Sequence, residues 1–318
     1  MNMKYKAYLC SFLLTFPILG KASVEADSLR QIQISRLQEQ VNWVNPEAIR
    51  AYLDDTKSSL GDKAPVLYQK LEELETLLPQ VNRHLSEDTT RQTIAEAEKL
   101  LALKREIILA NPLLDVDKIL IARYRLGNKA RKAMGPSLGT SVANYNSLFS
   151  SRRKGYDAEI SQLSNLRGDI QSKTIYKPEA DVPISDIQLH WDANRLLFSS
   201  LNENRQWQIY EINTDGTGLH QKVVVDEPDL EFCDANYLPD GKVVATCNIG
   251  YNGVPCVHGD DVVANLVSYD PETKNIHRLT FDQDGNWAPI VIPNGRLMYT
   301  RWEYTDLMHY YSRFVMHM

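Results

Sequence analysis

The carboxy-terminal part of the chain, positions 181–318, repeats one strand-turn-strand pattern three times, and this repeat constrains the fold more than any other feature. The three turns read DANR at 192–195, PDGK at 239–242 and PNGR at 293–296, and each runs directly into an apolar strand. A period of roughly 50 residues, with about four strands in each unit, is typical of β-propeller blades. The repeat therefore predicts an architecture, but no chemistry.

Size and charge narrow the class of protein. A chain of 318 residues can hold two or three domains, each with its own core. The net charge of −6 shows no basic excess, and affinity for nucleic acid depends on clustered Lys and Arg. Two short basic groups, at 129–132 and 152–154, are more simply explained as solvated loop charges. Nucleic acid is therefore not an expected partner.

The amino-terminal segment, positions 1–22, has the pattern of a secretory signal peptide. Lys4 and Lys6 form a basic start, and the apolar run at 7–19 is too short for a membrane-spanning helix. Small residues at 20 and 22 offer a cleavage site, and Ala26 ends a second one. We therefore expect an exported protein, periplasmic or extracellular, with no transmembrane segment after signal cleavage.

Three cysteines follow the signal peptide: Cys233, Cys247 and Cys256. Export permits disulfides, but an odd number leaves one thiol over. A hairpin with its tip at 240–241 places Cys233 nearly opposite Cys247, although a bridge there is geometrically tight. Cys247 with Cys256 is the other possible pair, and unpaired buried thiols are the third possibility. The sequence leaves all three open.

The segment at 28–112 has the pattern of short antiparallel helices. Asp27 or Ser28 can cap the first helix. Asn45 followed by Pro46 is a strong start signal for the second, because Asn caps well and proline suits the first helical position. The sequence therefore predicts a helical region ahead of the repeats.

Proline is expected to divide the rest of this region. Pro65 is predicted to begin a helix that Pro79 ends, and residues 86–89 are predicted to open the last helix. Leucines at 67, 71, 74 and 78 have the spacing of one apolar stripe. On the last helix the expected buried face comprises Ile94, Ala97, Leu101 and Ile108. The glutamates between these stripes are expected to lie on solvated surfaces.

The segment at 113–180 changes in character and is predicted to link the helices to the repeats. Three stretches look like short strands, at 118–122, 158–163 and 174–176. Positions 127–151 are rich in Gly, Ser, Asn and basic side chains, which predicts a long loop. The partial β-propeller is then expected to occupy positions 181–318.

Two resemblances accompany these motifs. The blade pattern of an aspartate-rich turn, an apolar strand, an Ile-Tyr strand and an Asp-Gly turn is similar to the TolB-type six-bladed propeller. GVPC at 253–256, LTFDQD at 279–284 and YTRWEYTD at 299–306 resemble proteins related to the alpha subunit of hydrazine synthase, in that family's middle propeller domain. The segment from LKRE at 103–106 to NPLL at 111–114 resembles the stretch before that propeller.

The second resemblance implies haem chemistry for the family, because hydrazine synthesis there depends on c-type haem. Covalent haem attachment needs a CxxCH motif, which this sequence lacks, since Cys256-Val257-His258 has no partner cysteine. Three blades do not close a ring, so we expect a truncated chain whose later blades and any haem-bearing part are missing. No cofactor is expected in this chain itself.

Two groups of residues have metal-binding types, and both patterns are weak. Asp282 and Asp284 supply alternating oxygen ligands before a glycine, as calcium loops do, but an inter-strand turn explains the same pattern. Cys256 and His258 are zinc ligands by type, yet four ligands at fixed spacing are absent. We therefore expect no metal site, and no catalytic or cofactor-binding residues.

Aromatic residues crowd positions 302–311, together with Asp306 and His309. Core packing between blades explains aromatics on alternate strand positions, and a ligand surface in the channel is the alternative. The sequence has no nucleophile motif and no phosphate-binding glycine loop. A hydrolase that acts on glycans or peptides through Asp306 or His309 is therefore a weaker third option.

The sequence as a whole predicts an α+β protein, with a helical N-terminal region followed by an incomplete TolB-like β-propeller of about three blades. The first functional hypothesis is an exported binding or scaffold module without catalysis of its own. Its partner would be an unknown protein or a small ligand at the propeller. The alternative is the front fragment of a periplasmic haem-dependent redox enzyme.

Overall fold

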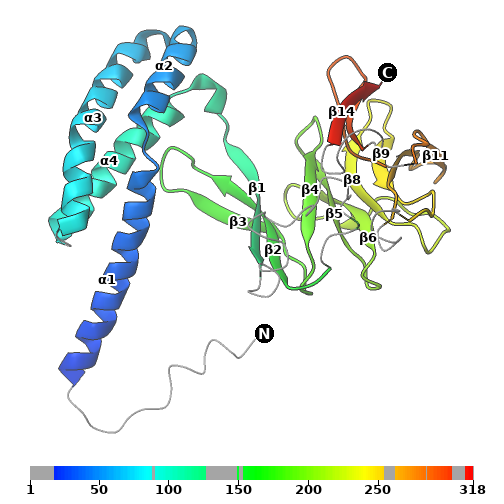
Figure 1. The fold of residues 1–318 in the computed structure, drawn as a ribbon, viewed down its shortest axis with the longest axis horizontal. Helices are drawn as coiled ribbons and strands as arrows, with labels where there is room; N and C mark the ends of the chain where they lie inside the picture. The colour runs from blue at the N-terminus through cyan, green and yellow to red at the C-terminus, as the bar shows by residue number, and fades with distance from the viewer. Residues whose placement is uncertain are drawn as a thin grey trace. The chain divides into compact units, whose positions relative to one another are not determined.

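A computed structural model describes residues 18–87, 90–126, 149, 153–253, 262–283, 285–302 and 312–317. The chain forms two compact units, Met1–Asp117 and Lys118–Met318. Helices build the first unit and antiparallel sheets build the second (Figure 1). Within the described ranges, no helix combines the length and the apolar character needed to cross a membrane.

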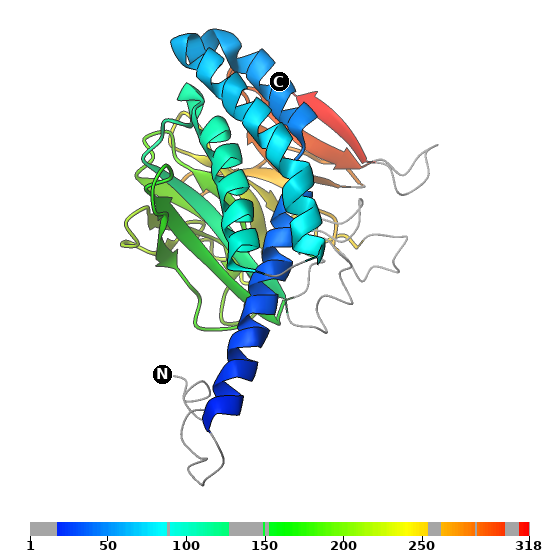
Figure 2. The same cartoon turned by 90° about the vertical axis from the view of Figure 1, so that its left-hand side faces the viewer.

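Four helices make up the first unit. They are α1 (Ile18–Asn42), α2 (Pro46–Leu60), α3 (Ala64–Glu87) and α4 (Arg91–Leu109), with short 3-10 turns at Gly61–Lys63 and Pro112–Leu114. The predicted start of α2 is confirmed, because Oδ1 of Asn45 accepts a hydrogen bond of 3.0 Å from the backbone N–H of Ala48. In Figure 2, α1 extends beyond the other three helices at its amino-terminal end.

Three predicted helix boundaries are wrong. Helix α1 begins at Ile18 rather than at a cap on Asp27 or Ser28, and Oγ1 of Thr90 caps α4 through the N–H of Thr93. Pro79 lies inside α3 instead of ending it. A proline inside a helix removes one backbone hydrogen bond. The helix continues because its apolar stripe continues past Pro79 and stays buried, and packing outweighs local preference.

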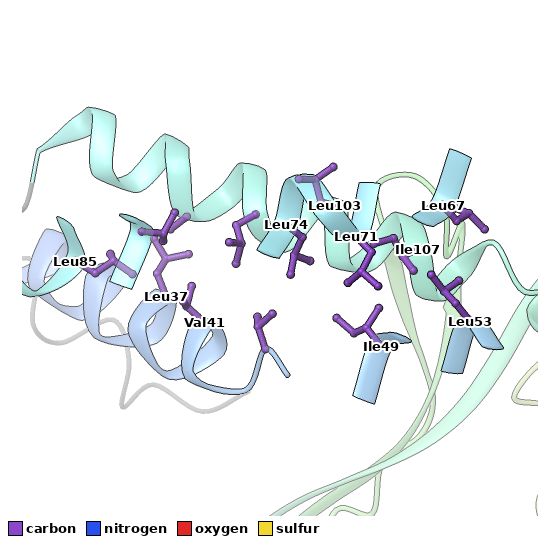
Figure 3. Packing of buried hydrophobic residues seen from close by; sticks show 14 of the residues in the cluster. Leu37, Val41, Ile49, Leu53, Leu67, Leu71, Leu74, Leu85, Leu103 and Ile107 are labelled. Atoms are coloured by element: carbon purple, nitrogen blue, oxygen red, sulfur yellow. The ribbon is translucent and has the colours of Figure 1, made fainter. Parts of the chain in front are cut away.

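The helical core is made of leucine and other aliphatic side chains (Figure 3). The stripe at 67, 71 and 74 is confirmed, and Leu71 and Leu74 are fully buried. On α4 the buried face differs in part from the prediction, because this helix packs against both α1 and α3. It comprises Thr93, Ala97, Leu100, Leu103 and Ile107.

Four antiparallel sheets make up the second unit. The first contains β1 (Lys118–Leu126), β2 (Tyr156–Ser164) and β3 (Gln171–Tyr176). The second contains β4 (Ile184–Leu189), β5 (Arg195–Leu201), β6 (Trp207–Asn213) and β7 (His220–Gln221). The third contains β8 (Phe232–Tyr237), β9 (Val243–Cys247), β10 (Asn265–Tyr269) and β11 (Ile276–Arg278). The fourth contains β12 (Asn286–Val291), β13 (Leu297–Trp302) and β14 (Ser312–His317).

Each of the three predicted turns joins the first two strands of one sheet, from the second sheet to the fourth. Gly241 and Gly295 take φ values of 84° and 81°, in the left-handed region where glycine has no steric penalty. Ala193 also has a positive φ in the first turn, at 57°. The repeated turn chemistry in the sequence thus corresponds to three equivalent hairpins.

Consecutive sheets pack against one another through apolar side chains. Ile160 of β2 belongs to the same buried cluster as Ile184 and Phe198 of the second sheet. Leu197 of β5 is likewise clustered with Phe232 of β8. The first strands also meet, β4 against β8 and β8 against β12. Sheets that follow in chain order with their first strands side by side form a propeller-type arrangement.

The segment predicted to link the helices to the repeats contains the three expected strands, and these strands pair as the first sheet. This sheet belongs to the same compact unit as the repeats. The long loop expected at 127–151 lies outside the described residues except for Phe149, which is buried with Trp207 and Trp302. Positions 1–17 of the expected signal peptide also lie outside them.

Candidate functional site

The first strands of the last three sheets share one irregularity. The pairing register shifts within β4, β8 and β12, which marks a β-bulge in each. At the bulge, Asp186, Asp234 and Ala288 take φ values of 51°, 55° and 51°. Non-glycine residues rarely adopt this conformation, and it is concentrated at functional sites. A bulge also re-aims the side chain that it carries.

Two of these equivalent positions hold carboxyl groups, and the two groups face each other. The side chains of Asp186 and Asp234 lie within hydrogen-bonding range of one another. Oδ1 of Asp186 accepts a hydrogen bond of 3.1 Å from the hydroxyl of Ser185. Oδ2 of Asp186 is buried and accepts from no donor. We call Asp186 and Asp234 the carboxyl pair.

The second member of the carboxyl pair is held by neighbouring strands. Oδ2 of Asp234 accepts from the hydroxyl of Thr246 at 3.1 Å and from the backbone N–H of Ala288 at 3.2 Å. The thiol of Cys233 also donates to this oxygen, at 3.6 Å. The backbone N–H of Asp234 donates to the hydroxyl of Ser199 at 3.1 Å. Asp234 thus joins strands of the second, third and fourth sheets.

Burial determines the protonation of Asp186, the first member of the carboxyl pair. It raises the pKa of Asp186 well above the ordinary range, and the negative charge of Asp234 raises it further. Burial and the same two carboxyl groups raise the pKa of the Cys233 thiol, which therefore stays protonated. A protonated Asp186 can donate to Asp234. Perturbed carboxyl groups of this kind mark candidate sites for holding or transferring a proton.

The carboxyl pair is not among the residues predicted from the sequence, although the repeat contains a signal for it. The sequence separation between Asp186 and Asp234 is nearly the same as that between Ser199 and Thr246. These two hydroxyl residues pair with the residues that directly precede the acids, Ser199 with Ser185 and Thr246 with Cys233. The first two turns, at 192–195 and 239–242, have the same separation as Ser199 and Thr246. An acid and a hydroxyl recurring with the turn period could have indicated a repeated polar site.

A second cluster lies where β4 and β8 reach their turns, and we call it the Tyr237 cluster. It consists of His190, Trp191, Arg195, Glu211 and Tyr237. The rings of His190 and Tyr237 are in edge contact at 4.6 Å between centroids. The guanidinium of Arg195 lies over the Tyr237 ring and contacts Nε2 of His190 at 2.7 Å. These three side chains therefore hold one another in place.

Glu211 anchors the Tyr237 cluster. Its carboxylate accepts from the Tyr237 hydroxyl at 2.9 Å and pairs with Lys222 at 3.0 Å. Arg195 and His220 lie 3.8 and 3.5 Å from the same carboxylate. Burial, and then the Glu211 charge, raises the pKa of Tyr237, so the hydroxyl remains a donor. This network fixes the base of the cluster.

Trp191 lies on this fixed base and is exposed. Its side chain is 62% accessible, whereas Tyr237 is 8% accessible. The neighbouring Leu189 is also exposed. Trp, Tyr and Arg are the residues most enriched where protein surfaces contribute binding energy. The Tyr237 cluster can therefore bind a partner through an aromatic face with polar groups around it.

The metal-ligand candidates from the sequence are not brought together among the described residues. Asp282 forms an ion pair with Arg301 at 2.8 Å in the connection between β11 and β12. Cys256, His258 and Asp284 lie outside the described residues. Throughout the described part of the chain, no three His, Cys, Asp or Glu side chains are grouped to hold a metal ion.

The structure contradicts one prediction about the cysteines and agrees with one about the aromatic residues. Cys233 and Cys247 are buried free thiols, so a bridge between them is wrong. Cys233 pairs with Thr246 and Cys247 with Phe232, which directs the two cysteine side chains to opposite faces of the sheet. Trp302 is buried, as core packing predicts. Asp306, His309 and the neighbouring tyrosines lie outside the described residues.

Comparisons with solved structures find partial likeness. The chain is similar to hydrazine synthase from Kuenenia stuttgartiensis, with 14% identity, a TM-score of 0.47, and coverage of 63% of this chain and 30% of that one. It is similar to a putative TolB from Agrobacterium tumefaciens, with 14% identity, a TM-score of 0.36 and 48% of each chain covered. It is also similar to an oligogalacturonate lyase in complex with manganese, with 14% identity, a TM-score of 0.39, and coverage of 61% of this chain and 46% of that one.

The chain spans less than half the length of each of these structures. No family model matches the sequence, and no curated protein matches it.

Proposed function

We propose that this chain is an exported binding module of the propeller type, related to the alpha subunit family of hydrazine synthase, with no catalysis of its own. The four sheets would be consecutive blades of a propeller. Support comes from the shared bulges of β4, β8 and β12 and from the motifs at 279–284 and 299–306. The binding surface is the Tyr237 cluster.

The observation that carries this proposal is the exposed indole of Trp191 on a base held by ionic and aromatic contacts. An exposed aromatic side chain on a rigid base loses little conformational freedom on binding. Arg195 and Lys222 neutralise the buried Glu211 at that base. The cluster thus presents a flat apolar face with a polar rim, which suits a partner protein or a small ligand with an apolar face.

Export and the absence of haem belong to the same proposal. The apolar run at 7–19 would direct secretion, with cleavage after residue 22 or residue 26. Without a CxxCH motif the chain would carry no covalently attached haem. Mass spectrometry of the secreted protein tests both points. A mature chain that begins at 23 or 27 without haem mass is expected, and an intact amino terminus would contradict export.

A photo-crosslinking amino acid placed at position 191 in the full-length chain tests the binding surface. Tyr251 provides the matched control, because it is exposed to 58% and lies in the connection that follows β9, at the end of that strand away from the turn. Crosslinking in the native cells should give a discrete product several times more abundant from position 191 than from position 251. Equal yields, or no product at 191, would contradict the proposal.

A companion variant tests whether the base of the cluster matters. Tyr237→Phe keeps the ring that contacts His190 but removes the hydroxyl that donates to Glu211. If the ordered base positions Trp191, the crosslink yield at 191 should fall in this variant while the fold, measured by circular dichroism, is kept. An unchanged yield would show that Trp191 acts without the cluster.

A further inference from the structure

The carboxyl pair joins neighbouring sheets at equivalent positions of their first strands. Asp186 belongs to β4 and Asp234 to β8, and each lies at the bulge of its strand. The described donors to the pair are hydroxyls, a thiol and one backbone N–H group. No lysine or arginine is among these donors in the described part of the chain. The negative charge of the pair therefore has no cationic counterpart among them.

Two other titratable groups lie near the pair, the Cys233 thiol and the Glu231 carboxylate. The charges of Asp186 and Asp234 both act on the Cys233 thiol, and so does the charge of Glu231. Glu231 itself is neutralised by Arg153, whose two terminal nitrogens contact its two carboxylate oxygens at 2.8 and 3.0 Å. Arg153 therefore neutralises Glu231 and not the carboxyl pair.

Two buried carboxylates in contact are not both ionised at neutral pH, because the charged forms repel and lack solvation. A single proton placed between them converts the repulsion into a charge-assisted hydrogen bond. It would also give the buried Oδ2 of Asp186 a role, as this atom has no donor.

We propose that Asp186 and Asp234 share one proton, and that this proton fastens β4 to β8, so that the junction between the second and third sheets loosens when the proton is lost. The fourth sheet is linked to the same event, because the N–H of Ala288 donates to Asp234. A change in external pH would thus alter the packing of successive sheets.

The direction of the pH effect follows from the raised pKa of Asp186. The stabilisation from the shared proton is complete below the pKa of an aspartate in the unfolded chain, about 3.9. It decreases as the pH rises through the folded-state value, because the unfolded chain releases the proton more readily. Stability should therefore fall toward alkaline pH.

Urea unfolding of the full-length protein between about pH 5 and pH 9 tests this proposal. Asp186→Asn retains a donor toward Asp234 without a titrating proton, and Asp240→Asn replaces an exposed turn aspartate paired with Lys242 as the control. The urea concentration at the midpoint of unfolding should fall as the pH rises in the wild type and in Asp240→Asn. In Asp186→Asn this midpoint should change much less with pH. Equal pH dependence in wild type and Asp186→Asn would overturn the proposal.

If Asp186→Asn does not fold, infrared spectroscopy of the wild type provides an independent test of the shared proton. With isotope-labelled aspartate, a protonated carboxylic acid should give its carbonyl band at neutral pH, and the band should vanish at alkaline pH. The protection factor of the Ala288 amide, which corrects for the faster intrinsic exchange at higher pH, should fall over the same pH range. Absence of the protonated band at neutral pH would overturn the proposal.

Discussion

The two units of this protein are stabilised by different kinds of interior. In the helical unit the buried residues are nearly all aliphatic, and charged side chains pair on the surface, as Lys99 does with Glu73. In the sheet unit, acids, hydroxyls and amides are buried at the bulges of the first strands, where they join one sheet to the next. Apolar stripes form most of the interior of the first unit, whereas the interior of the second also depends on polar groups whose partners are distant in sequence.

The largest effects should come from the apolar core of either unit. Phe198→Ala removes a fully buried ring that contacts Tyr176 and Tyr210, and Leu74→Ala removes a fully buried leucine. We expect the free energy of unfolding to fall by about 3–5 kcal/mol in Phe198→Ala and by about 2–5 kcal/mol in Leu74→Ala. Chemical denaturation measures both. A loss below about 1 kcal/mol for Phe198→Ala would contradict the packing of the first two sheets.

The ion pair of Arg153 with Glu231 should have the next largest effect. Glu231 is mostly buried, and its carboxylate also accepts from the backbone N–H of Trp207 at 2.7 Å. Glu231→Ala leaves the Trp207 amide and the guanidinium without this acceptor, so we expect a loss of about 1–3 kcal/mol. Glu203→Ala, at an exposed loop position, is the control. Similar losses in both variants would show that the pair is unimportant.

Helix capping in the first unit should contribute less. Asn45→Ala removes the side-chain acceptor for the N–H of Ala48, and we expect a loss of about 1 kcal/mol. Asn45→Gly should cost only a few tenths of a kcal/mol, because glycine is tolerated at the cap. Thermal unfolding of the two variants measures the difference. Equal losses would mean that the side chain of Asn45 does not cap α2.

The smallest effect should come from the exposed ion pair of Lys99 and Glu73, whose side chains are 60% and 46% accessible. A double-mutant cycle with alanine at both positions should give a coupling of about 0.5 kcal/mol or less, which decreases further with added salt. A coupling as large as the stability loss expected for Glu231→Ala would contradict the difference between exposed and buried charges.

The difference between the aliphatic interior of the helical unit and the partly polar interior of the sheet unit explains what the sequence could predict. Leu67, Leu71 and Leu74 follow the helical period, and the turns at 239–242 and 293–296 contain the glycines that hairpins require, so the sequence predicts both features. Pro79 does not end α3, contrary to the prediction, because tertiary packing outweighs a local helix breaker. The strands at 118–176 were predicted, but their packing onto the second sheet depends on contacts that no local pattern contains.

The candidate sites were predicted less completely than the fold. Asp186 and Asp234 have no unusual neighbours in the sequence, and their proximity depends on a bulge in each strand and on the contact between β4 and β8. The Tyr237 cluster is assembled from three strands and a turn, so its residues are scattered between 190 and 237. Only the spacing of the repeats indicates in advance that such positions would meet.

Hydrogen exchange at the backbone amide of Ala288 tests most directly whether buried polar groups join the sheets. This amide donates to Oδ2 of Asp234 on the neighbouring sheet. The account predicts slow exchange at neutral pH in the wild type and a large loss of protection in Asp234→Ala, with the amide of Leu197 still protected. Rapid exchange at Ala288 in the wild type, or protection that survives Asp234→Ala, would contradict it.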